Sequence, residues 1–320
     1  MTKKKLKVAV IYGGRSPEHE VSIESARKVI EALDRKKYSV ASIKIPKSGK
    51  FNYDTLRKFD VVLPILHGLL GEDGTIQGLL KLINVPFGGA GVLGSAVGMD
   101  KDVAKRLLRD AEILVPKFLV YRQGEKILFN EVKGALGTPI FIKPANLGSS
   151  VGIHKVKNKR EFERAVKDAF KYDSKIIIEE TINGKEIECA VIGNEKPVAS
   201  FPGEIIPKDE FYTYKAKYDN SGGTVYKIPA RLSGKFTKKI QKLAIRTYKV
   251  LSCEGMGRVD MFLTKSGKIF VNEINTIPGP VMFRRMWEAS GMPFSKVLDK
   301  LIRLAIERFN REKKLKTTFK

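Results

Sequence analysis

The chain has 320 residues, of which 42% are hydrophobic and 30% charged, a composition that fits a folded globular protein and excludes a disordered or collagen-like chain. No apolar run reaches the roughly 18 residues that a membrane span needs, and two cysteines exclude a disulfide scaffold and fit a reducing cytoplasm. The net charge of +25 comes from basic residues scattered over every segment, which favours a generally lysine-rich surface over a specific nucleic-acid partner, with polyanion binding as the alternative.

Strand-like and helix-like patterns alternate over the first 90 residues. In order, we predict a strand over 6–12, a helix over 17–33, strands over 40–45 and 61–66, and a helix over 75–83. This alternation indicates a Rossmann-like parallel sheet, in which ligands lie beyond the carboxyl ends of the strands. We therefore expect residues 13–18 and 67–74 to face one cleft.

A glycine-rich connector over 88–98 separates this segment from the rest of the chain. The later predicted elements are a helix over 100–110, strands over 140–143 and 152–156, a helix over 159–172, strands over 176–180 and 185–192, a loop over 207–228, a helix over 235–252, two final strands, a terminal helix over 294–308 and a solvated tail over 311–320. The predicted fold class combines α/β and α+β. We place the domains at residues 1–93, 94–178 and 179–320.

The two final strands carry a pattern of oxygen-bearing side chains. Ser266-Gly267 predicts a turn between them, so that the strands pair as an antiparallel hairpin with Asp260 opposite residue 272 or 273. Glu273 and Asn275 are two residues apart and therefore share one face. Carboxylate and amide oxygens, without His or Cys, suit Mg²⁺. Ordinary surface acids are the alternative, which the flanking apolar residues weaken because an unpaired carboxylate among them is costly.

A loop rich in glycine and serine, residues 143–152, lies between two predicted strands. Its glycines and small hydroxyl groups allow backbone N–H groups to close on phosphate oxygens, and Lys143 supplies a charge of the opposite sign. It is not a Walker loop, because no Gly-Lys pair in the chain is followed by Ser or Thr. Taken alone, the loop could also be a plain hairpin.

Together with the three-part layout, these motifs resemble the ATP-grasp superfamily and, within it, the D-alanine–D-alanine ligases. The resemblance runs from about residue 6 to residue 308. Its motifs, in chain order, are Gly13-Gly14-Arg15-Ser16-Pro17-Glu18, Leu66-His67-Gly68, Gly71-Glu72-Asp73-Gly74-Thr75, Met99-Asp100-Lys101, Lys143-Pro144, Gly148-Ser149-Ser150, Tyr212-Thr213-Tyr214, Lys217-Tyr218, Gly257-Arg258-Val259-Asp260, Asn272-Glu273-Ile274-Asn275 and Pro278-Gly279. The resemblance implies an ATP-grasp fold with an N-terminal Rossmann-like domain.

The resemblance also implies an ATP site with bound metal. The residues that match its nucleotide contacts are Lys101, Lys143 and Lys217 at the phosphates, Ser149 and Ser150 in the phosphate loop, Glu179, Glu180 and Ile182 at the adenine, and Glu186 at the ribose. Asp260, Glu273 and Asn275 match the ligands of two Mg²⁺ ions, which Mn²⁺ could replace.

For the first amino-acid substrate, the resemblance implies that Glu18 holds the ammonium group, with Ser149 and Tyr218 completing a hydrogen-bonded triad. His67 matches a residue near the carboxyl group of that substrate. Arg258 and the N–H of Gly279 match the groups that stabilise the oxyanion. Structural alternatives stay open for these residues. Glu18 could favour its helix N-terminus, and His67 could be a satisfied histidine at a strand end. Three aromatic residues could be loop packing: Tyr212, Tyr214 and Tyr218.

One segment departs from the family pattern. After Pro278-Gly279 the family continues with a threonine and a serine, and that serine holds the carboxylate of the second substrate. Here Pro280-Val281-Met282-Phe283 follows, so the serine is missing. We expect Arg284 or Arg285 to supply the contact, because arginine binds carboxylates bidentately, and backbone donors are the alternative.

The implied activity is the ATP-dependent ligation of two D-alanines through a D-alanyl phosphate, which gives D-alanyl-D-alanine, ADP and phosphate for peptidoglycan synthesis in the cell wall. A related ligase that joins D-alanine or another small amino acid to a different acceptor is the nearest alternative. A basic nucleic-acid-binding protein with a degenerate ligase fold is the alternative from another class, and the intact lysines and metal ligands argue against it. The resemblance further implies a cytoplasmic homodimer that acts on small molecules, with no specific nucleic-acid partner and no membrane.

Overall fold

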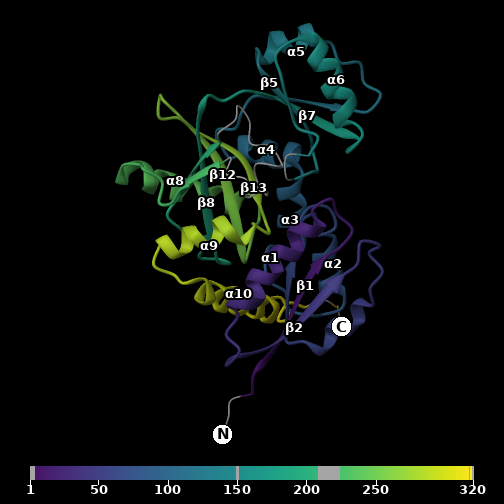
Figure 1. Cartoon of the computed structure of the whole chain (residues 1–320), viewed down its shortest axis with the longest axis vertical. Coiled ribbons are helices and arrows are strands. Elements are labelled where there is room, and N and C mark those ends of the chain that lie inside the picture. The colour runs from purple at the N-terminus through teal and green to yellow at the C-terminus, as the bar shows by residue number, and fades with distance from the viewer. Residues whose placement is uncertain (1–3, 149–150, 208–223, 317, 319–320) are drawn as a thin grey trace.

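The computed structural model describes residues 4–148, 151–207, 224–316 and 318. Three β-sheets follow one another along the long axis of the molecule (Figure 1). The N-terminal sheet lies at one end, and the helices α5 (Phe129–Leu136) and α6 (Lys159–Ala169) lie at the other. Among the described residues, none of the helices combines the length and the apolar character that a bilayer crossing requires.

The N-terminal sheet is parallel, as predicted. It consists of β1 (Leu6–Gly13), β2 (Tyr38–Ile45) and β3 (Val61–Ile65) in the order β2-β1-β3, and the short 3-10 helix η1 (Tyr53–Lys58) precedes β3. Val8 and Val10 pack in one core cluster with α1 (His19–Ala32), and Ala9 and Ile11 pack in another with α2 (Thr75–Leu82). Both faces of β1 are therefore buried, which explains its continuous apolar run.

The glycine-rich segment after this sheet contains a helix, where we predicted only a connector. α3 (Val92–Met99) leads directly into α4 (Lys101–Asp110). A Cβ atom on Gly94 would lie 2.5 Å from the carbonyl oxygen of Ser252, and one on Gly98 would lie 3.0 Å from Thr276 Cγ2. The glycines thus allow α3 to pack closely against the C-terminal part of the chain. The prediction was wrong because this packing outweighs the low helix propensity of glycine.

The middle sheet is antiparallel, with the order β4-β7-β5-β6. Its strands are β4 (Phe118–Arg122), β5 (Ile140–Pro144), β6 (His154–Val156) and β7 (Lys175–Glu180). Ile142 and Ile178 face α5 and α6 in one core cluster. Because side chains alternate along a strand, Lys143 and Glu179 point to the opposite face, toward the rest of the molecule. The sequence analysis missed β4 and α5.

The C-terminal sheet has the order β11-β10-β8-β12-β13, and β9 pairs with β8 off this path. Its strands are β8 (Gly184–Ile192), β9 (Val198–Ala199), β10 (Gly203–Pro207), β11 (Thr224–Lys227), β12 (Met256–Thr264) and β13 (Ile269–Asn275). The predicted loop over 207–228 is partly strand, because β11 pairs with β10; residues 208–223 lie outside the described residues. α8 (Gly234–Val250) packs on this sheet through Ile240 and Ala244.

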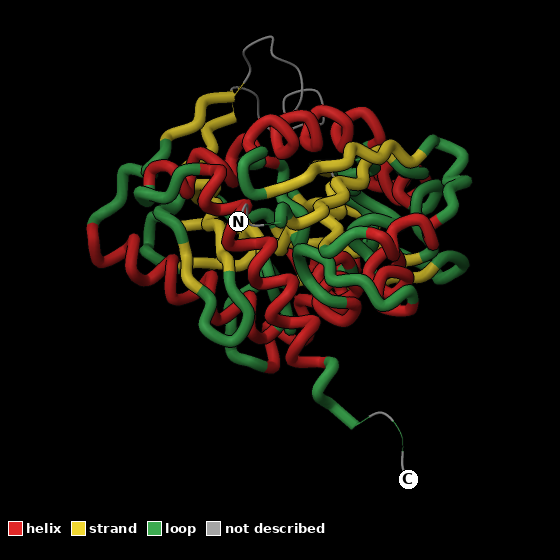
Figure 2. The backbone as a smooth tube through the Cα atoms, turned by 90° about the horizontal axis from the view of Figure 1, so that it is seen from below, coloured by secondary structure: helices red, strands yellow, loops and turns green. Residues whose placement is uncertain are grey.

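The last two helices connect the C-terminal sheet to the N-terminal one. α9 (Pro280–Ala289) was not predicted, and α10 (Phe294–Glu312) is longer than expected. Arg311, which we placed in a solvated tail, belongs to α10 and pairs with Glu195 and Glu254, so that expectation was wrong. α10 crosses the N-terminal sheet, where Asp299 accepts a hydrogen bond from Tyr38 Oη at 2.8 Å. Residues 313–316, which follow α10, lead away from the body of the molecule (Figure 2).

Candidate active site

The predicted hairpin forms the floor of the candidate site. β12 and β13 pair antiparallel, with Asp260 opposite Glu273 and Arg258 opposite Asn275, which confirms the predicted register. Arg258 donates to both carboxylate oxygens of Asp260, from Nε to Oδ1 and from Nη2 to Oδ2, each at 2.7 Å. Asn275 Nδ2 also donates to Asp260 Oδ2, at 3.0 Å. Burial would lower the pKa of Arg258, but Asp260 and Glu188 raise it well above its usual value. The guanidinium therefore stays charged in a buried position.

The oxygen atoms of this hairpin fit a hard divalent cation. Asp260 and Glu273 remain partly exposed, with 17% and 25% of their side-chain surface accessible, and Asn275 lies on the same face of β13 as Glu273. Over residues 4–148, 151–207, 224–316 and 318, no cluster of three His, Cys, Asp or Glu side chains could hold a metal alone. Two carboxylates and an amide oxygen would thus bind Mg²⁺ only with further ligands, such as water or phosphate.

Two of the predicted phosphate-binding lysines converge on this hairpin from other elements. Lys101 begins α4, and its Nζ atom donates to the carbonyl oxygen of Leu147 at 2.7 Å and lies 3.4 Å from Glu273 Oε2. Lys143 lies on β5, and its Nζ atom donates to Glu179 Oε2 at 2.7 Å and to Asn272 Oδ1 at 3.3 Å. Helix α4, the middle sheet and the hairpin therefore meet around two buried ammonium groups.

A third lysine, which the sequence analysis missed, completes this cluster. Lys105 lies one helical turn after Lys101, is 1% exposed, and its Nζ atom is 3.1 Å from Glu179 Oε1. Burial would raise the pKa of Glu179, but Lys105 and Lys143 lower it. Burial lowers the pKa of Lys105, whereas the pKa of Lys143 is raised against its own burial by Glu179 and Glu273. The spacing of four residues between Lys101 and Lys105 was the available signal.

Glu18 lies where two loops approach each other, as the predicted cleft requires. It is the N-cap residue of α1 and is buried. A Cβ atom on Gly68 would lie only 2.5 Å from Glu18 Oε2, and one on Gly148 would lie 3.2 Å from the same atom. The segment after β3 and the glycine-rich loop thus enclose the Glu18 carboxylate between them. Glycine is required at position 68 by this contact and by its positive φ of 73°.

His67 and Glu72 connect the same region to the C-terminal part of the chain. His67 Nε2 is 2.9 Å from Ser25 Oγ, and burial lowers the pKa of His67 to about 4, so that its ring is neutral at pH 7. Glu72 accepts hydrogen bonds from the N–H groups of Gly68 and Ile277 at 2.8 and 3.1 Å. Burial, followed by the Glu18 carboxylate, raises the pKa of Glu72 to about 8. Glu72 belongs to a family motif, but the sequence alone predicts no role for it.

The other predicted residues differ in how close they come to this cluster. Glu186 pairs with Ile205 and Phe262 of neighbouring strands and lies close enough to raise the pKa of Lys143. The side chain of Glu180 instead accepts a hydrogen bond from the N–H of Lys117 at 2.8 Å, and Ile182 is partly buried after β7. Gly279 is the N-cap residue of α9. Ser149, Ser150, Lys217 and Tyr218 lie outside the described residues.

The two arginines of α9 have different surroundings. Arg284 pairs with Glu288 at 2.7 Å on the exposed side of the helix. The guanidinium carbon of Arg285 lies 5.8 Å from the ring centre of Tyr226, on β11 beside the undescribed residues 208–223. Arg285 is therefore the more available of the two for an added carboxylate.

Comparisons with known proteins agree with this arrangement. The model of the D-ala D-ala ligase C-terminus matches residues 107–303, and that of the N-terminus matches residues 7–58 and 52–90. The chain belongs to the D-alanine–D-alanine ligase family. This confirms the family resemblance, the ATP-grasp fold with its N-terminal parallel sheet, and the ligase class of the enzyme.

Full-length relatives support the family assignment. The chain is 45% identical to the D-alanine--D-alanine ligase of Oceanobacillus iheyensis, with 98% of this chain and 99% of that protein covered. Ligase A of Escherichia coli strain K12 is 40% identical, with 98% and 99% covered. The D-alanine-D-alanine ligase structure from Coxiella burnetii superposes with a TM-score of 0.87 at 38% identity, covering 98% and 97% of the two chains. The VanG D-Ala:D-Ser ligase of Enterococcus faecalis reaches 0.84 at 36% identity, covering 94% and 100%.

Proposed function

We propose that this enzyme uses ATP to join two D-alanines into D-alanyl-D-alanine for the cell wall, with release of ADP and phosphate. The observation that carries the proposal is the convergence of Lys101 and Lys143 on the carboxylate-bearing hairpin. Both ammonium groups are buried and face acids or carbonyl groups, an arrangement that phosphate oxygens can complete. The family membership of the chain supports the use of this arrangement for the activation of a carboxylate.

The nucleotide would lie between the middle and C-terminal sheets. We assign Lys101 and Lys143 to the phosphates, with Ser149, Ser150 and Lys217 beside them from segments outside the described residues. Glu179 and the backbone that follows it would read the adenine, and Glu186 would hold the ribose. The contact between Glu180 and Lys117 directs the Glu180 side chain toward the backbone before β4, so its contribution to the adenine pocket would come from its main chain.

Asp260, Glu273 and Asn275 would hold two Mg²⁺ ions, which Mn²⁺ could replace. Bound magnesium would neutralise phosphate charge as the γ-phosphoryl group is transferred. Binding requires that Asp260 share its oxygens between Arg258 and the metal, and that the Asn275 amide turn its oxygen toward the ion. Both changes are local side-chain rotations in a partly exposed site.

The first D-alanine would bind at the cleft between the N-terminal sheet and the glycine-rich loop. The Glu18 carboxylate would accept the ammonium group, together with Ser149 and Tyr218. His67 is neutral, so it can lie near the substrate carboxyl group without forming an ion pair. Arg258 and the N–H of Gly279 would stabilise the oxyanion that forms when the amine attacks.

The reaction then proceeds in two steps. A carboxylate oxygen of the first D-alanine attacks the γ-phosphorus of ATP, and the bond to the bridging oxygen of ADP breaks. The amine of the second D-alanine attacks the carbonyl carbon of the acyl phosphate, loses a proton, and expels inorganic phosphate. Enclosure of the site would keep water from the acyl phosphate.

The acceptor side of the site departs from the family pattern, because the family serine after Gly279 is missing. The names of the curated relatives favour D-alanine over a different acceptor. One structural relative is a D-Ala:D-Ser ligase, which makes D-serine the acceptor to compare directly.

Several finer expectations stay predictions: the homodimer, the cytoplasmic location, the absence of a specific nucleic-acid partner, and the three domain boundaries.

Cys189 and Cys253 are both free and buried, and burial raises the pKa of each thiol to about 12, so they would remain as inert thiols in a reducing compartment.

The test is phosphate release by the purified enzyme with ATP and Mg²⁺, using D-alanine, L-alanine and an equimolar mixture of D-alanine and D-serine. We expect release with D-alanine and none with L-alanine, and mass spectrometry should show the dipeptide as D-alanyl-D-alanine. ATP cleavage that does not depend on a D-amino acid would contradict the proposal. A mixed dipeptide as the main product would replace D-alanine by D-serine as the acceptor.

A further inference from the structure

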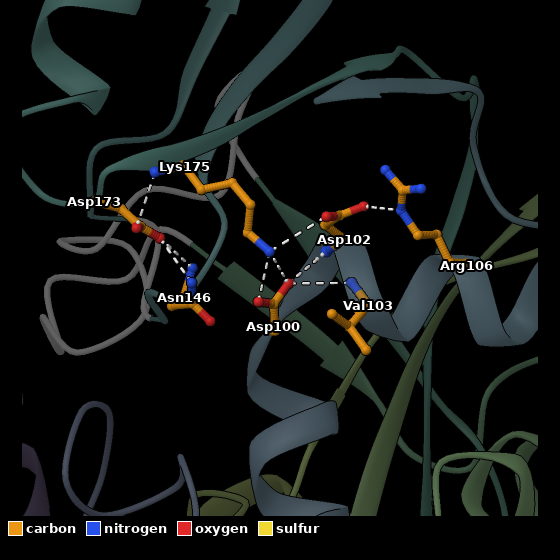
Figure 3. Close-up of polar contacts among 7 residues, drawn as sticks. All are labelled: Asp100, Asp102, Val103, Arg106, Asn146, Asp173 and Lys175. Atoms are coloured by element: carbon orange, nitrogen blue, oxygen red, sulfur yellow. Dashed lines mark hydrogen bonds and ion pairs between the residues drawn. The ribbon is translucent and has the colours of Figure 1, made fainter. Parts of the chain in front are cut away.

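A second group of charged side chains surrounds a buried lysine near the lysines assigned to the phosphates. No role has been assigned to this group so far. Lys175 begins β7 and is 7% exposed. Its Nζ atom lies 2.8 and 2.6 Å from the two carboxylate oxygens of Asp100 and 3.3 Å from Asp102 Oδ2 (Figure 3). Burial would raise the pKa of Asp102, but hydrogen bonds from Arg106 and Lys175 lower it. The cluster is therefore a set of ion pairs that joins the start of β7 to the start of α4.

Asp100 is the residue that fixes the start of α4. Its Oδ1 atom accepts hydrogen bonds from the N–H groups of Asp102 and Val103, both at 3.1 Å, which is the N-cap arrangement. The next residue is Lys101, whose N–H donates to the carbonyl oxygen of Ala145 at 3.0 Å. Lys175 thus holds the cap of the helix whose first residue carries the phosphate-binding ammonium group.

The same end of β7 also binds residues 145 and 146 of the glycine-rich loop. The N–H of Ala145 donates to the carbonyl oxygen of Lys175 at 3.0 Å. Asp173 Oδ2 accepts from the N–H and Nδ2 of Asn146 at 2.8 and 3.0 Å, and Asp173 Oδ1 accepts from the N–H of Lys175 at 3.1 Å (Figure 3). Leu147, the residue after Asn146, accepts a hydrogen bond from Lys101 Nζ through its carbonyl oxygen.

These contacts form a closed circuit. On one side, the Lys175 ammonium group binds Asp100, the residue before Lys101. On the other side, the Lys175 carbonyl oxygen binds the N–H of Ala145, and the chain continues through Asn146 to Leu147. Lys101 Nζ donates to the carbonyl oxygen of Leu147, so both connections end at Lys101. Removing the Lys175 ammonium group leaves the Asp100 carboxylate without its cation and frees the helix cap to turn. Lys101 and the loop would then lose their fixed relation.

We propose that Lys175 is a positioning residue, which sets Lys101 and the loop segment 145–148 in register for the nucleotide phosphates. The inference rests on the proposed function, in which Lys101 binds a phosphate of ATP. Arg106 provides a matched comparison, because it pairs with Asp102 Oδ1 at 2.5 Å and 57% of its side chain is exposed. Among the described residues, no hydrogen bond or ion pair joins Arg106 to Asp100 or to residues 145–148.

The experiment measures the dissociation constant of a non-hydrolysable ATP analogue with Mg²⁺ by calorimetry, without D-alanine and well below the melting temperature of each variant. Lys175→Met should weaken binding at least tenfold, and Arg106→Met should change it less than twofold. In a Lys101→Met background, Lys175→Met should add less than a threefold effect, because its route of action is already removed. Equal losses in both backgrounds, or no loss from Lys175→Met, would overturn the proposal.

Asp100→Asn covers the case in which Lys175→Met does not fold. Asparagine caps a helix as well as aspartate does but cannot form the ion pair, so the same loss and the same non-additivity with Lys101→Met are expected. The outcome for the overall function is separate. Failure of the wild-type enzyme to cleave ATP with D-alanine would refute the ligase proposal while the affinities still decide the role of Lys175. Unchanged analogue affinity in Lys101→Met would refute both the Lys101 assignment and this inference.

Discussion

Glu18 is the one described side chain to which we assign the ammonium group of the first substrate. Glu18→Gln keeps the shape of the side chain and removes its charge, and a charge-assisted hydrogen bond is worth roughly 1.5 to 3 kcal/mol. We expect the KM for the first D-alanine to rise roughly 10- to 150-fold, with the KM for ATP nearly unchanged. Steady-state kinetics with each substrate varied in turn would measure both constants.

Glu20, two residues after Glu18 in the first turn of α1, provides the control for Glu18. It is exposed and pairs with Lys47 at the surface. Glu20→Gln should leave both KM values unchanged. If Glu18→Gln raises the two KM values equally, Glu18 has a structural role and the substrate assignment fails.

His67 makes the stability of the fold depend on pH. Its pKa is about 4 in the folded protein and about 6.5 when exposed, so between these values the unfolded chain binds more protons. The contribution of His67 to the free energy of unfolding should therefore fall by up to about 3 kcal/mol as the pH drops from 6.5 to 4. Urea unfolding at pH 7 and pH 4.5 measures the change.

His67→Gln should flatten this pH dependence, because it removes the group that gains a proton on unfolding. The same substitution at His154, which lies in the partly exposed pair with Asp168, controls for the loss of a histidine. Equal pH dependence in the wild type and in His67→Gln would contradict the assignment.

At the scale of elements, the β12–β13 hairpin carries the metal assignment. Glu273→Gln should leave the unfolding transition nearly unchanged, because the side chain is partly exposed, and should lower kcat at least 100-fold through loss of a metal ligand. Glu163→Gln, on the exposed side of α6, is the control. Wild-type turnover in Glu273→Gln, or activity that survives EDTA, would remove magnesium from the hairpin.

Helix α9 offers the element-scale test of acceptor binding. Arg284 is already paired with Glu288, whereas Arg285 lies over Tyr226. Arg285→Ala should weaken acceptor binding by about 1 to 3 kcal/mol, seen as a higher KM for the second D-alanine, and Arg284→Ala should not. Unchanged acceptor KM in both variants would leave the carboxylate to backbone donors.

The elements that the sequence predicted well are those whose pattern follows from local burial. Both faces of β1 are covered, so its continuous apolar run predicts a buried strand. The turn at Ser266-Gly267 predicts the register of the hairpin. Helix α3 was missed because its glycines reflect contacts with Ser252 and Thr276, far away in the sequence. Tertiary contacts of this kind leave no periodic signal.

At the scale of the whole molecule, the site is assembled from segments that only the fold brings together. Lys143 and Asn272 are 129 residues apart, and Glu72 reaches the N–H of Ile277 from 205 residues away. The family motifs predict which residues would meet ligands. They did not identify Lys105 or Lys175, because the acids that pair with these lysines, Glu179 and Asp100, lie 74 and 75 residues away in the sequence.

The most direct test of carboxylate activation at this site uses D-alanine labelled with ¹⁸O in its carboxylate. If a carboxylate oxygen attacks the γ-phosphorus and the amine then displaces phosphate, each released phosphate must carry one oxygen from the substrate. Mass spectrometry of the phosphate formed by the wild-type enzyme should therefore show one ¹⁸O atom per turnover and one lost from the dipeptide. Unlabelled phosphate would contradict the account, because it would mean that water cleaves ATP without activation of the D-alanine carboxylate.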